Sequence, residues 1–398
     1  MPRPFDPAVL REDPYPVYAR LREKAPIVRA QLGSQEAWVV SRYDDCVQAL
    51  RDPSLELAAV RGWVPPELGQ GPAARILPRL LAVQDPREPN RIRALISKAF
   101  TARAVEALRR PTHELVGRVL DRAQAKGSMD LVEDFAFPVA LGVVAELLAV
   151  PAEDTALLSA WAPQAALMFE PDGLGPGGVE RCDAASEELW AWFEEHVRRH
   201  RRRPGDDLMA ALIGVHCGAQ CLSDDELVAF CVQLVTLGCR VSQALIGNAG
   251  LALARHPEQA ERLRRDPSLA VSTVEECLRW DSPVQLALRL AVRDTSLRGF
   301  VIERGQTVYV LLGSANRDPE LFDEPDRFEI ARRGPPHLAF GSGPRSFLSG
   351  RAARMPAQVA LPALVRRFPR LRAAADPALR RPTLLVRSLQ HCPVVLHD

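Results

Sequence analysis

Six consecutive residues inside a long apolar segment include side chains of the kinds that enzymes use in catalysis. They are Leu237, Gly238, Cys239, Arg240, Val241 and Ser242. Arg240 could stabilise a developing anion, and Cys239 could act as a nucleophile if its pKa were lowered. The structural alternatives are an ion pair between Arg240 and a nearby carboxylate, and a role for Cys239 as a small buried hydrophobic residue. Cys239, Arg240 and Ser242 are therefore candidates, and the residue types alone assign none of them as catalytic.

The helix that positions these residues is expected to begin after Ser223. Ser223 is followed by Asp-Asp-Glu, which is typical of a helix N-cap. The hydroxyl accepts a hydrogen bond from a free backbone N–H, and carboxylates favour the positive end of the helix dipole. Helical apolar spacing continues to about Arg255. The sequence thus predicts one long helix with residues 237–242 near its middle.

Most of the remaining chain also shows helical spacing. We expect helices starting near Asp13, at 43–51, within 88–125, at 137–150, at 180–199 and around 272–280. Strands are expected at 37–41, within 286–310 with a turn at Arg298-Gly299, at 383–389 and at 394–396. Residues 61–80 are rich in Gly and Pro, which predicts an irregular loop. The expected class is mostly α with small β-sheets.

Composition excludes several classes of function. The chain has 398 residues, of which 47% are hydrophobic and 25% charged, with a net charge of +1. This balance suits one large core and gives no reason to expect nucleic acid or an acidic membrane surface as a partner. The run Arg198–Arg203 favours a solvated helix end over a surface for an acidic partner. We expect no signal peptide, no membrane anchor and a cytoplasmic location.

The eight cysteines show no paired framework, which favours reduced thiols in a cytosol. Two groups resemble metal pairs, namely His216 with Cys217 and Cys221, and His196 with His200. Neither has the four-ligand spacing of a structural zinc site. We therefore prefer a loop thiol for the first, a solvated helix face for the second, and no metal at either.

Residues 337–354 carry a motif that identifies a family. They read His-Leu-Ala-Phe-Gly-Ser-Gly-Pro-Arg-Ser-Phe-Leu-Ser-Gly-Arg-Ala-Ala-Arg. This resembles the haem-binding loop of the cytochrome P450 family, F-G-x-G-x-[H/R]-x-C-x-G. The residues on their pattern positions are Phe340, Gly341, Gly343 and Arg345. The order of elements resembles the family over essentially the whole chain, which implies a triangular prism with a helix-rich and a β-rich lobe in a single domain, residues 1–398.

Phe347 stands where the family has the cysteine that ligates iron. The oxygen chemistry of the family depends on a thiolate that pushes electron density through the iron, and a phenyl ring cannot do this. Shifting the register by one residue places Leu348 there instead, and Ser346 and Ser349 are offset from the ligand position. The resemblance therefore implies that no cofactor is expected, or that haem binds without thiolate ligation.

The segment around Arg240 departs from the family a second time. The family reads A-G-x-[D/E]-T, in which an acid and an alcohol supply protons. The following Ile246-Gly247-Asn248 fixes the register, so that Arg240 replaces the acid and Val241 the threonine. Ser242 is one residue further, about 100° around a helix. We expect no proton delivery through this pair. The residues expected to line the former substrate pocket are Leu237, Gly238 and Val241.

Two further sets of charged residues match the family. Glu276 and Arg279 fit its E-x-x-R pair and share a helix face, and the resemblance implies Arg327 as the third partner of a structural network. The arginines that fit the cations around the haem propionates are Arg93, Arg289 and Arg345. Pro89 replaces the histidine of the family's H-x-x-x-R. Either haem or another anion lies among these arginines, or they face water and local carboxylates.

Three functions follow. The chain resembles a haem-free subgroup of bacterial homologues that lacks the cysteine and activates a deoxysugar glycosyltransferase in antibiotic biosynthesis, and we rank this auxiliary role first. The alternative is a haem-independent enzyme whose pocket, between residues 61–80 and 237–242, promotes cyclisation, isomerisation or elimination. A haem monooxygenase with atypical ligation ranks last. The expected partner is a glycosyltransferase, another biosynthetic enzyme or a small-molecule intermediate.

Overall fold

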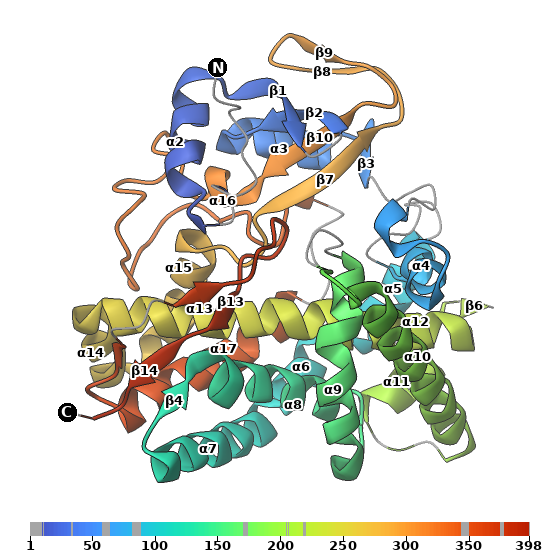
Figure 1. Ribbon diagram of the computed structural model, residues 1–398, viewed down its shortest axis with the longest axis vertical. Coiled ribbons are helices and arrows are strands. Elements are labelled where there is room, and N and C mark those ends of the chain that lie inside the picture. The colour runs from blue at the N-terminus through green and yellow to red at the C-terminus, as the bar shows by residue number, and fades with distance from the viewer. Residues whose placement is uncertain are drawn as a thin grey trace.

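The chain folds into a helix-rich lobe and a smaller lobe built around a β-sheet (Figure 1). The computed structural model describes residues 10, 12–32, 35–57, 64–81, 89–169, 174–203, 205, 207–217, 220–343, 350–374 and 378–397. The architecture is the expected one, since most elements are helices and the strands form small sheets.

The α-helices are α2 (Tyr15–Lys24), α3 (Tyr43–Arg51), α4 (Pro72–Ile76), α5 (Pro89–Ala99), α6 (Ala102–Ala107), α7 (Arg109–Lys126), α8 (Phe137–Leu147), α9 (Thr155–Ala165), α10 (Gly178–Arg202), α11 (Leu208–Gly214), α12 (Asp224–Gln233), α13 (Cys239–Arg255), α14 (Pro257–Arg265), α15 (Ala270–Trp280), α16 (Leu312–Ala315) and α17 (Gly350–Arg367). Short 3₁₀ segments are η2 (Pro66–Leu68), η3 (Leu77–Arg79), η5 (Ala152–Asp154), η6 (Ala166–Phe169) and η9 (Pro267–Leu269). Two π-helical segments are η4 (Leu131–Ala136) and η8 (Leu234–Gly238). The helix predicted at 43–51 is confirmed, and the helix predicted at 137–150 is confirmed as far as Leu147.

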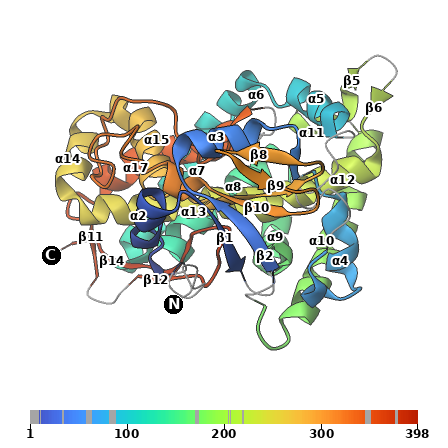
Figure 2. The ribbon, with the colours of Figure 1, turned by 90° about the horizontal axis from the view of Figure 1, so that it is seen from above.

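The main sheet joins strands from distant parts of the chain in the order β1-β2-β10-β7-β3. These are β1 (Ile27–Leu32), β2 (Gln35–Val40), β10 (Thr307–Leu311), β7 (Leu286–Ala291) and β3 (Leu55–Leu57). Only the pair β2–β10 among them is parallel, with Trp38 opposite Val308. Apolar side chains on its two faces pack in separate clusters, one with α3 and one with α2. Viewed from above, the sheet lies over the helical lobe (Figure 2).

The smaller strands complete the molecule. They are β4 (Met129–Asp130), β5 (His216–Cys217), β6 (Gln220–Cys221), β8 (Thr295–Leu297), β9 (Phe300–Ile302), β11 (Arg372–Ala373), β12 (Leu379–Arg380), β13 (Leu389–His391) and β14 (Pro393–Val395). The turn predicted at Arg298-Gly299 is confirmed between β8 and β9, and both residues have positive φ angles of 47° and 82°. The C-terminal strand predicted at 383–389 is wrong for most of its length. Within it Val386 forms only an isolated bridge to Val284, and a regular strand begins at Leu389.

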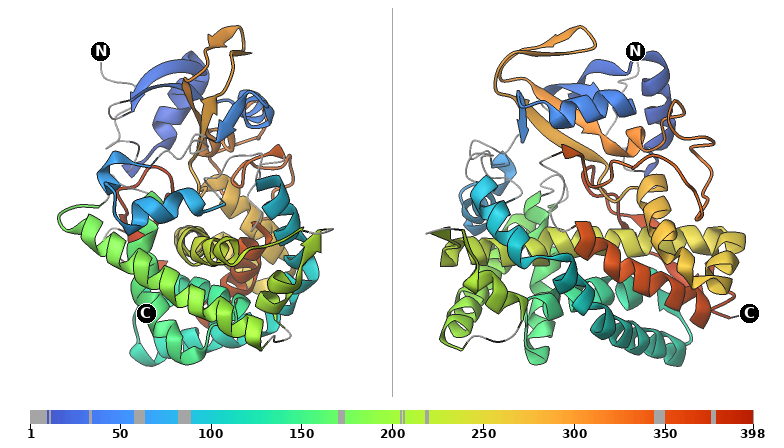
Figure 3. Two further views of the ribbon diagram at one scale, coloured as in Figure 1. Left: turned by 90° about the vertical axis from the view of Figure 1, so that its right-hand side faces the viewer. Right: turned by 180° about the vertical axis from the view of Figure 1, so that it is seen from behind.

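The long helix predicted from Ser223 is confirmed, with one interruption. Ser223 accepts a hydrogen bond from the Glu226 backbone, and the Glu226 carboxylate accepts one from Ser223 N in return. The π-helical η8 then separates α12 from α13. The run Asp224–Arg255 is long and apolar enough to cross a membrane by composition, yet 89% of its apolar window is buried inside the protein. The left view of Figure 3 shows it nearly end-on, surrounded by other helices.

The prediction of an irregular loop at 61–80 is wrong for most of the described part. That part contains η2, α4 and η3, and α4 packs against α10. Pro66 and Pro72 occupy first helical positions, where the missing N–H costs nothing. Gly71 is needed because a Cβ there would lie 1.9 Å from the Asp183 carboxylate, which accepts from Ala73 N at 2.9 Å. The prolines of this segment therefore begin helices and do not break them. Residues 61–63 lie outside the described part.

Candidate functional site

The six residues singled out in the sequence lie across the junction of η8 and α13. In η8 the hydrogen bonds span five residues, and such π segments occur often at functional sites. The hydroxyl of Thr236 donates to the Val232 carbonyl at 2.7 Å. Val241 is fully buried in the main core, and Ser242 is 6% exposed. The helix therefore presents Cys239 and Arg240 at the start of α13, directly after a local change in its winding.

Cys239 does not meet the condition for a nucleophile. Its side chain is buried, and burial raises the pKa of the Cys239 thiol to about 12. The thiolate is the reactive form of cysteine, and at neutral pH this thiol is protonated. Cys239 is thus a small buried hydrophobic residue.

Arg240 lines a small recess on the side of α13 that faces α8 and α9. Arg240 is 8% exposed. The described residues lining the recess are Phe137, Ala162, Pro163, Ala166, Val235, Thr236, Cys239, Arg240, Gln243 and Arg381. Leu237, Gly238 and Val241 are not among them, and no described residue of 64–81 is either. The pocket expected between residues 61–80 and this helix is thus not the one around Arg240.

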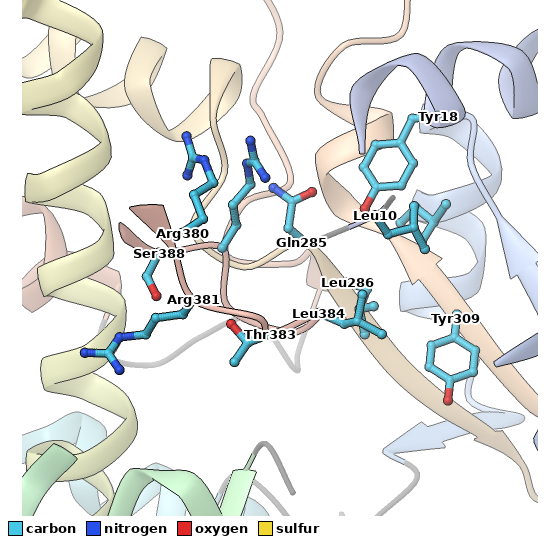
Figure 4. Close-up of a pocket in the computed structure, with 12 residues that line it drawn as sticks. Leu10, Tyr18, Gln285, Leu286, Tyr309, Arg380, Arg381, Thr383, Leu384 and Ser388 are labelled. Carbon is cyan, nitrogen blue, oxygen red and sulfur yellow. The ribbon is translucent and has the colours of Figure 1, made fainter. Parts of the chain in front are cut away.

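Arg381 is the residue of this recess that sequence reasoning missed. It belongs to the C-terminal segment 378–388, which returns to α13 after α17. Arg381 also contributes to a second small cavity between this segment and β7 (Figure 4). In Figure 4 its side chain extends toward α13, away from Thr383 and Leu384. No local pattern in the sequence reveals this contact, because it depends on how the end of the chain folds back.

A buried carboxylate holds the C-terminal segment in place. Asp281 accepts from Arg380 Nη2 at 2.8 Å, from Arg387 Nε at 2.9 Å and from the Tyr15 hydroxyl at 2.9 Å. Burial alone would raise the pKa of Asp281, but Arg380 and Arg387 lower it well below its usual range. The cluster borders a surface groove of about 1070 Å³ between α2 and the end of α13. The Asp281 cluster holds Arg380 and Arg387, which precede and follow Arg381 in the sequence.

The first half of the motif loop has the backbone that its glycines permit. Gly341 and Gly343 have φ angles of 74° and 76°, which only glycine adopts at low cost. Gly341 N donates to the Leu338 carbonyl at 2.7 Å. Phe340 is 9% exposed, with the Arg354 guanidinium 4.7 Å above its ring. Arg345 and Phe347 lie outside the described residues.

An ion cluster anchors this loop to α15 and α17. The Glu275 carboxylate accepts from Arg354 Nε at 2.6 Å, from Arg354 Nη2 at 2.9 Å and from His337 Nε2 at 3.0 Å. Burial raises the pKa of Glu275, and the hydrogen bonds from His337 and Arg354 outweigh it and lower the pKa to about 2. The cluster escaped the sequence analysis because its members come from three separate segments.

Glu276 and Arg279 pair as their spacing indicates, and Arg327 joins them through its backbone carbonyl while its side chain does not. Arg279 donates to Glu276 at 2.7 and 2.9 Å, and both side chains are almost fully buried. Arg327 contributes only its backbone carbonyl, 3.2 Å from Arg279 Nη2, while its own guanidinium pairs with Glu324. Arg332 supplies the third side chain. The segment between α16 and the motif loop turns Arg327 outward and Arg332 inward, which spacing alone does not reveal.

Two of the three arginines expected around haem propionates can be located. Arg93 is half-buried on α5, and burial lowers the pKa of its guanidinium. Arg289 is 3% exposed on β7, and its Nη1 donates to the Leu288 carbonyl at 3.0 Å. The convergence of Arg93, Arg289 and Arg345 remains a prediction, because Arg345 lies outside the described residues.

The donor groups of the motif loop do not fit a thiolate-ligated haem. Residues 344–349 read Pro-Arg-Ser-Phe-Leu-Ser and contain neither cysteine nor histidine. Elsewhere, burial raises the pKa of the thiols of Cys46, Cys182, Cys231, Cys239, Cys277 and Cys392. The residues at the ligand position of the motif therefore offer no thiolate to a haem iron.

Two groups were considered for metal binding. His196 and His200 each contact another part of the chain, and the group of His216, Cys217 and Cys221 lies partly outside the described residues. His196 Nε2 is 2.8 Å from the Leu148 carbonyl, and His200 Nε2 is 3.5 Å from the Asp207 carboxylate. The described residues contain no group of three or more His, Cys, Asp or Glu side chains arranged to hold a metal ion. The side chains of His216 and Cys217 are outside the described part.

Comparison with known proteins decides the family. The model of the family described as "Cytochrome P450" matches residues 8–372. The chain belongs to the cytochrome P450 family. Among its P450 relatives, the biotin biosynthesis cytochrome P450 of Bacillus subtilis is 34% identical over 390 residues, with 96% of each chain covered. The 6-deoxyerythronolide B hydroxylase of Saccharopolyspora erythraea is 35% identical over 394 residues, again covering 96% of each.

Solved P450 structures match the fold closely. P450BioI, in a complex with an acyl carrier protein that carries hexadec-9Z-enoic acid, gives a TM-score of 0.90 at 32% identity, covering 98% of this chain and 100% of that one. The P450 PksS of the bacillaene polyketide synthase of Bacillus subtilis gives 0.90 at 30% identity, covering 99% and 100%. The predicted P450 fold is thereby confirmed. The names of these relatives place P450 proteins similar to this chain in natural-product biosynthesis.

Proposed function

We propose that this P450 homologue is a non-oxidative auxiliary protein of bacterial natural-product biosynthesis, located in the cytoplasm, that binds and activates a partner enzyme. The observation that carries the non-oxidative part is Phe347 at the position of the iron-ligating cysteine. Without a thiolate, the electron donation that the oxygen chemistry requires is lost. A similar protein is named a hydroxylase, so the proposal rests on Phe347 and not on the fold.

The surroundings of α13 support the same interpretation. Arg240 and Val241 stand where the family has an acid and an alcohol, and Val241 is fully buried and carries no exchangeable proton. Cys239, the other candidate reactive group, is protonated because burial raises its pKa to about 12. These residues provide no nucleophile and no proton relay. A binding role therefore agrees with the site better than a catalytic one.

The buried ion pairs of the scaffold support a role in which the folded surface binds a partner. In the Glu276–Arg279 pair, the Glu275 cluster and the Asp281 cluster, each carboxylate is paired with an arginine. We propose a deoxysugar glycosyltransferase or another biosynthetic enzyme as the partner. The similar P450BioI has been crystallised in complex with an acyl carrier protein, which supports a protein partner in this family and adds carrier proteins as candidates.

A haem-independent enzyme is the second candidate function. The observation that favours it is the position of Arg240, which lines a recess where it could stabilise a developing anion in a cyclisation, isomerisation or elimination. The two candidates differ in what the loss of Arg240 does: an auxiliary protein would keep its activation of the partner, and an enzyme would lose turnover.

The experiment that tests the proposed function is spectroscopic. The protein is purified after haem supplementation, and the absorption spectrum and the reduced carbon monoxide difference spectrum are recorded for the wild type and for Phe347→Cys. We expect no thiolate-type carbon monoxide band from the wild type. A thiolate-type band from Phe347→Cys would show that the same scaffold accepts haem once the ligand is restored. A thiolate-type band from the wild type would overturn the proposal.

The partner is tested with the same preparation. Glycosyltransferases and acyl carrier proteins encoded near the gene are expressed, and complex formation is measured by size-exclusion chromatography with light scattering. We expect one of them to form a complex, and a glycosyltransferase partner to gain activity on adding this protein. Failure of every such protein to bind would remove the auxiliary role.

A further inference from the structure

We propose that Tyr18 and Gln285 bind a buried water molecule between helix α2 and the start of strand β7. The two groups that hold it are the hydroxyl of Tyr18 and the side-chain amide oxygen of Gln285. The site lies in the cavity shown in Figure 4, apart from the recess around Arg240. It does not depend on the proposed function, and it gives α2 a polar link to the Asp281 cluster.

The orientation of the Gln285 amide is fixed by one hydrogen bond. Gln285 is 3% exposed, and its Nε2 donates to the Ser282 carbonyl at 2.7 Å. The amide nitrogen must face that carbonyl oxygen, so Oε1 must point the other way. Within the described part of the chain Oε1 has no hydrogen-bond partner. A buried acceptor without a donor lowers stability, so this oxygen favours a donor from outside the chain.

The backbone beside Gln285 keeps this arrangement possible. Gly313 N donates to the Gln285 backbone carbonyl at 3.1 Å, which brings α16 close to the amide. A Cβ at Gly313 would lie 2.4 Å from Gln285 Oε1. The glycine therefore lets the amide oxygen keep its place at the cavity wall.

The hydroxyl of Tyr18 approaches the same cavity from α2. Tyr18 is 3% exposed, and burial raises the pKa of its hydroxyl, which is therefore protonated at neutral pH. None of the described residues forms a hydrogen bond with this hydroxyl. In Figure 4 the hydroxyl and the Gln285 amide oxygen point toward each other. No direct hydrogen bond joins them, so a molecule that accepts from Tyr18 and donates to Gln285 satisfies both groups.

The size of the cavity selects water as that molecule. The centre of a water molecule can occupy about 10 Å³ of the cavity, which is room for about one water and for no larger ligand. Buried waters typically bond polar groups that otherwise lack a partner. Ser388 Oγ also has no partner among the described residues and lines this cavity, but in Figure 4 it points away from Tyr18 and Gln285.

The water completes a chain of polar contacts from α2 to the C-terminal segment. Gln285 Nε2 also donates to the Tyr15 hydroxyl at 3.4 Å, and that hydroxyl donates to Asp281 at 2.9 Å. Asp281 in turn accepts from Arg380 and Arg387. The bridged Tyr18 hydroxyl thereby joins the network that positions residues 378–388.

A crystal structure at a resolution that shows ordered water tests the site directly. We expect one water oxygen within about 3 Å of both Tyr18 Oη and Gln285 Oε1. A water that contacts only one of the two groups, or no water beside either, would overturn the proposal.

Tyr18→Phe tests the site in solution through the sign of its effect. If a water bridges the two groups, losing the hydroxyl removes a hydrogen bond, and the unfolding constant measured in urea should rise about fivefold. An unpartnered buried hydroxyl would instead lower stability, so its removal would leave the constant unchanged or reduce it.

Thr273→Val is the matched control for Tyr18→Phe. The Thr273 hydroxyl is also buried without a partner in the described part of the protein, but it does not line this cavity. We expect its removal to leave the unfolding constant unchanged or to reduce it. A rise for Tyr18→Phe that is no larger than the one for Thr273→Val would overturn the water site.

A double-mutant cycle shows whether the two side chains share one partner. In the background of Gln285→Met, Tyr18→Phe should raise the unfolding constant much less than in the wild type, because the water has already lost its other partner. Equal effects of Tyr18→Phe in both backgrounds would contradict a shared water. These measurements use neither haem nor a partner enzyme, so the water site and the proposed function can fail separately.

Discussion

Arg332 Nε donates a hydrogen bond to Glu276 Oε1 at 3.2 Å, across 56 residues of sequence. The carboxylate of Glu276 thus accepts hydrogen bonds from both Arg279 and Arg332. It also accepts one from the Glu329 backbone N–H at 2.9 Å. This one buried group ties α15 to the segment that leads into the motif loop. None of these contacts involves residues 344–349, so they hold this part of the scaffold independently of the ligand position of the motif.

Arg279→Ala should be among the most destabilising substitutions in the chain. It leaves a buried carboxylate with less compensation and removes hydrogen bonds to the carbonyls of Asn316, Pro325 and Arg327. Breaking a buried pair in this way costs about 3–5 kcal/mol. Urea unfolding measures the loss. The matched control is Arg327→Ala, whose guanidinium is 58% exposed and should cost about 1 kcal/mol or less. Equal losses would contradict the network described here.

The stability of the protein should fall as the pH drops below about 6.5 because of His196. Burial lowers the pKa of His196 to about 4, although the Leu148 carbonyl opposes this effect. The unfolded chain has a histidine pKa of about 6.5, so between the two values the unfolded state binds more protons. Stabilisation by the neutral imidazole is complete above pH ~6.5 and is lost as the pH falls toward about 4.

The measurement compares wild type with His196→Gln, whose amide can still donate to the Leu148 carbonyl. Thermal unfolding is recorded from about pH 7 to about pH 5, the range in which the unfolded histidine titrates. We expect the wild type to lose more stability than the variant over this range. Parallel curves would show that His196 does not carry the acid sensitivity.

Cys239 should resist alkylation while Cys221 reacts. Burial raises the pKa of the Cys239 thiol to about 12, whereas Cys221 is exposed on β6. Iodoacetamide treatment near pH 8 followed by peptide mass spectrometry reports both sites at once. Cys239→Ala should also leave partner activation unchanged. Labelling of Cys239 at the rate of Cys221 would revive it as a candidate nucleophile.

Arg240→Ala separates the two candidate functions. If the protein is an auxiliary, the variant should activate its partner as the wild type does, since Arg240 is 8% exposed and unavailable to a docking protein. If it is a haem-independent enzyme, loss of anion stabilisation at one donor should lower turnover by about 10²–10³-fold. Turnover of the intermediate and partner activity are measured on the same preparation.

Local sequence patterns predicted several helices and the start of the long helix, but they were wrong for most of residues 64–80 and 383–389. The Ser223 cap gave the start of α12, and the i, i+3 spacing of Glu276 and Arg279 gave their buried pair. Both depend on residues within one turn of a helix, where spacing fixes geometry. The parallel pairing of β2 with β10 joins strands far apart in the chain, and no local pattern encodes it.

The candidate site could be predicted only in part for the same reason. Cys239 and Arg240 were found because they are adjacent in a recognisable helix. Arg381 was missed because its position depends on the Asp281 cluster. In that cluster Arg380 and Arg387 lie 99 and 106 residues from Asp281 in the sequence. The burial that keeps the Cys239 thiol protonated likewise depends on the packing of the whole protein, and the spacing of residues in the sequence does not reveal it.

The π-helical η8 sets the angular register of everything that follows it on the long helix. Each residue of an α-helix turns the chain by about 100°, and a π turn takes up one residue more than an α turn. The π segment Leu234–Gly238 therefore accommodates one extra residue between α12 and α13 with little rotation of the helix that follows, whereas the same residues wound as ordinary α-helix would rotate Arg240 by most of that angle. The arginine would then face a different neighbour although the sequence was unchanged, so the winding of this short stretch, and not the identity of residue 240 alone, decides whether the cation lines the recess.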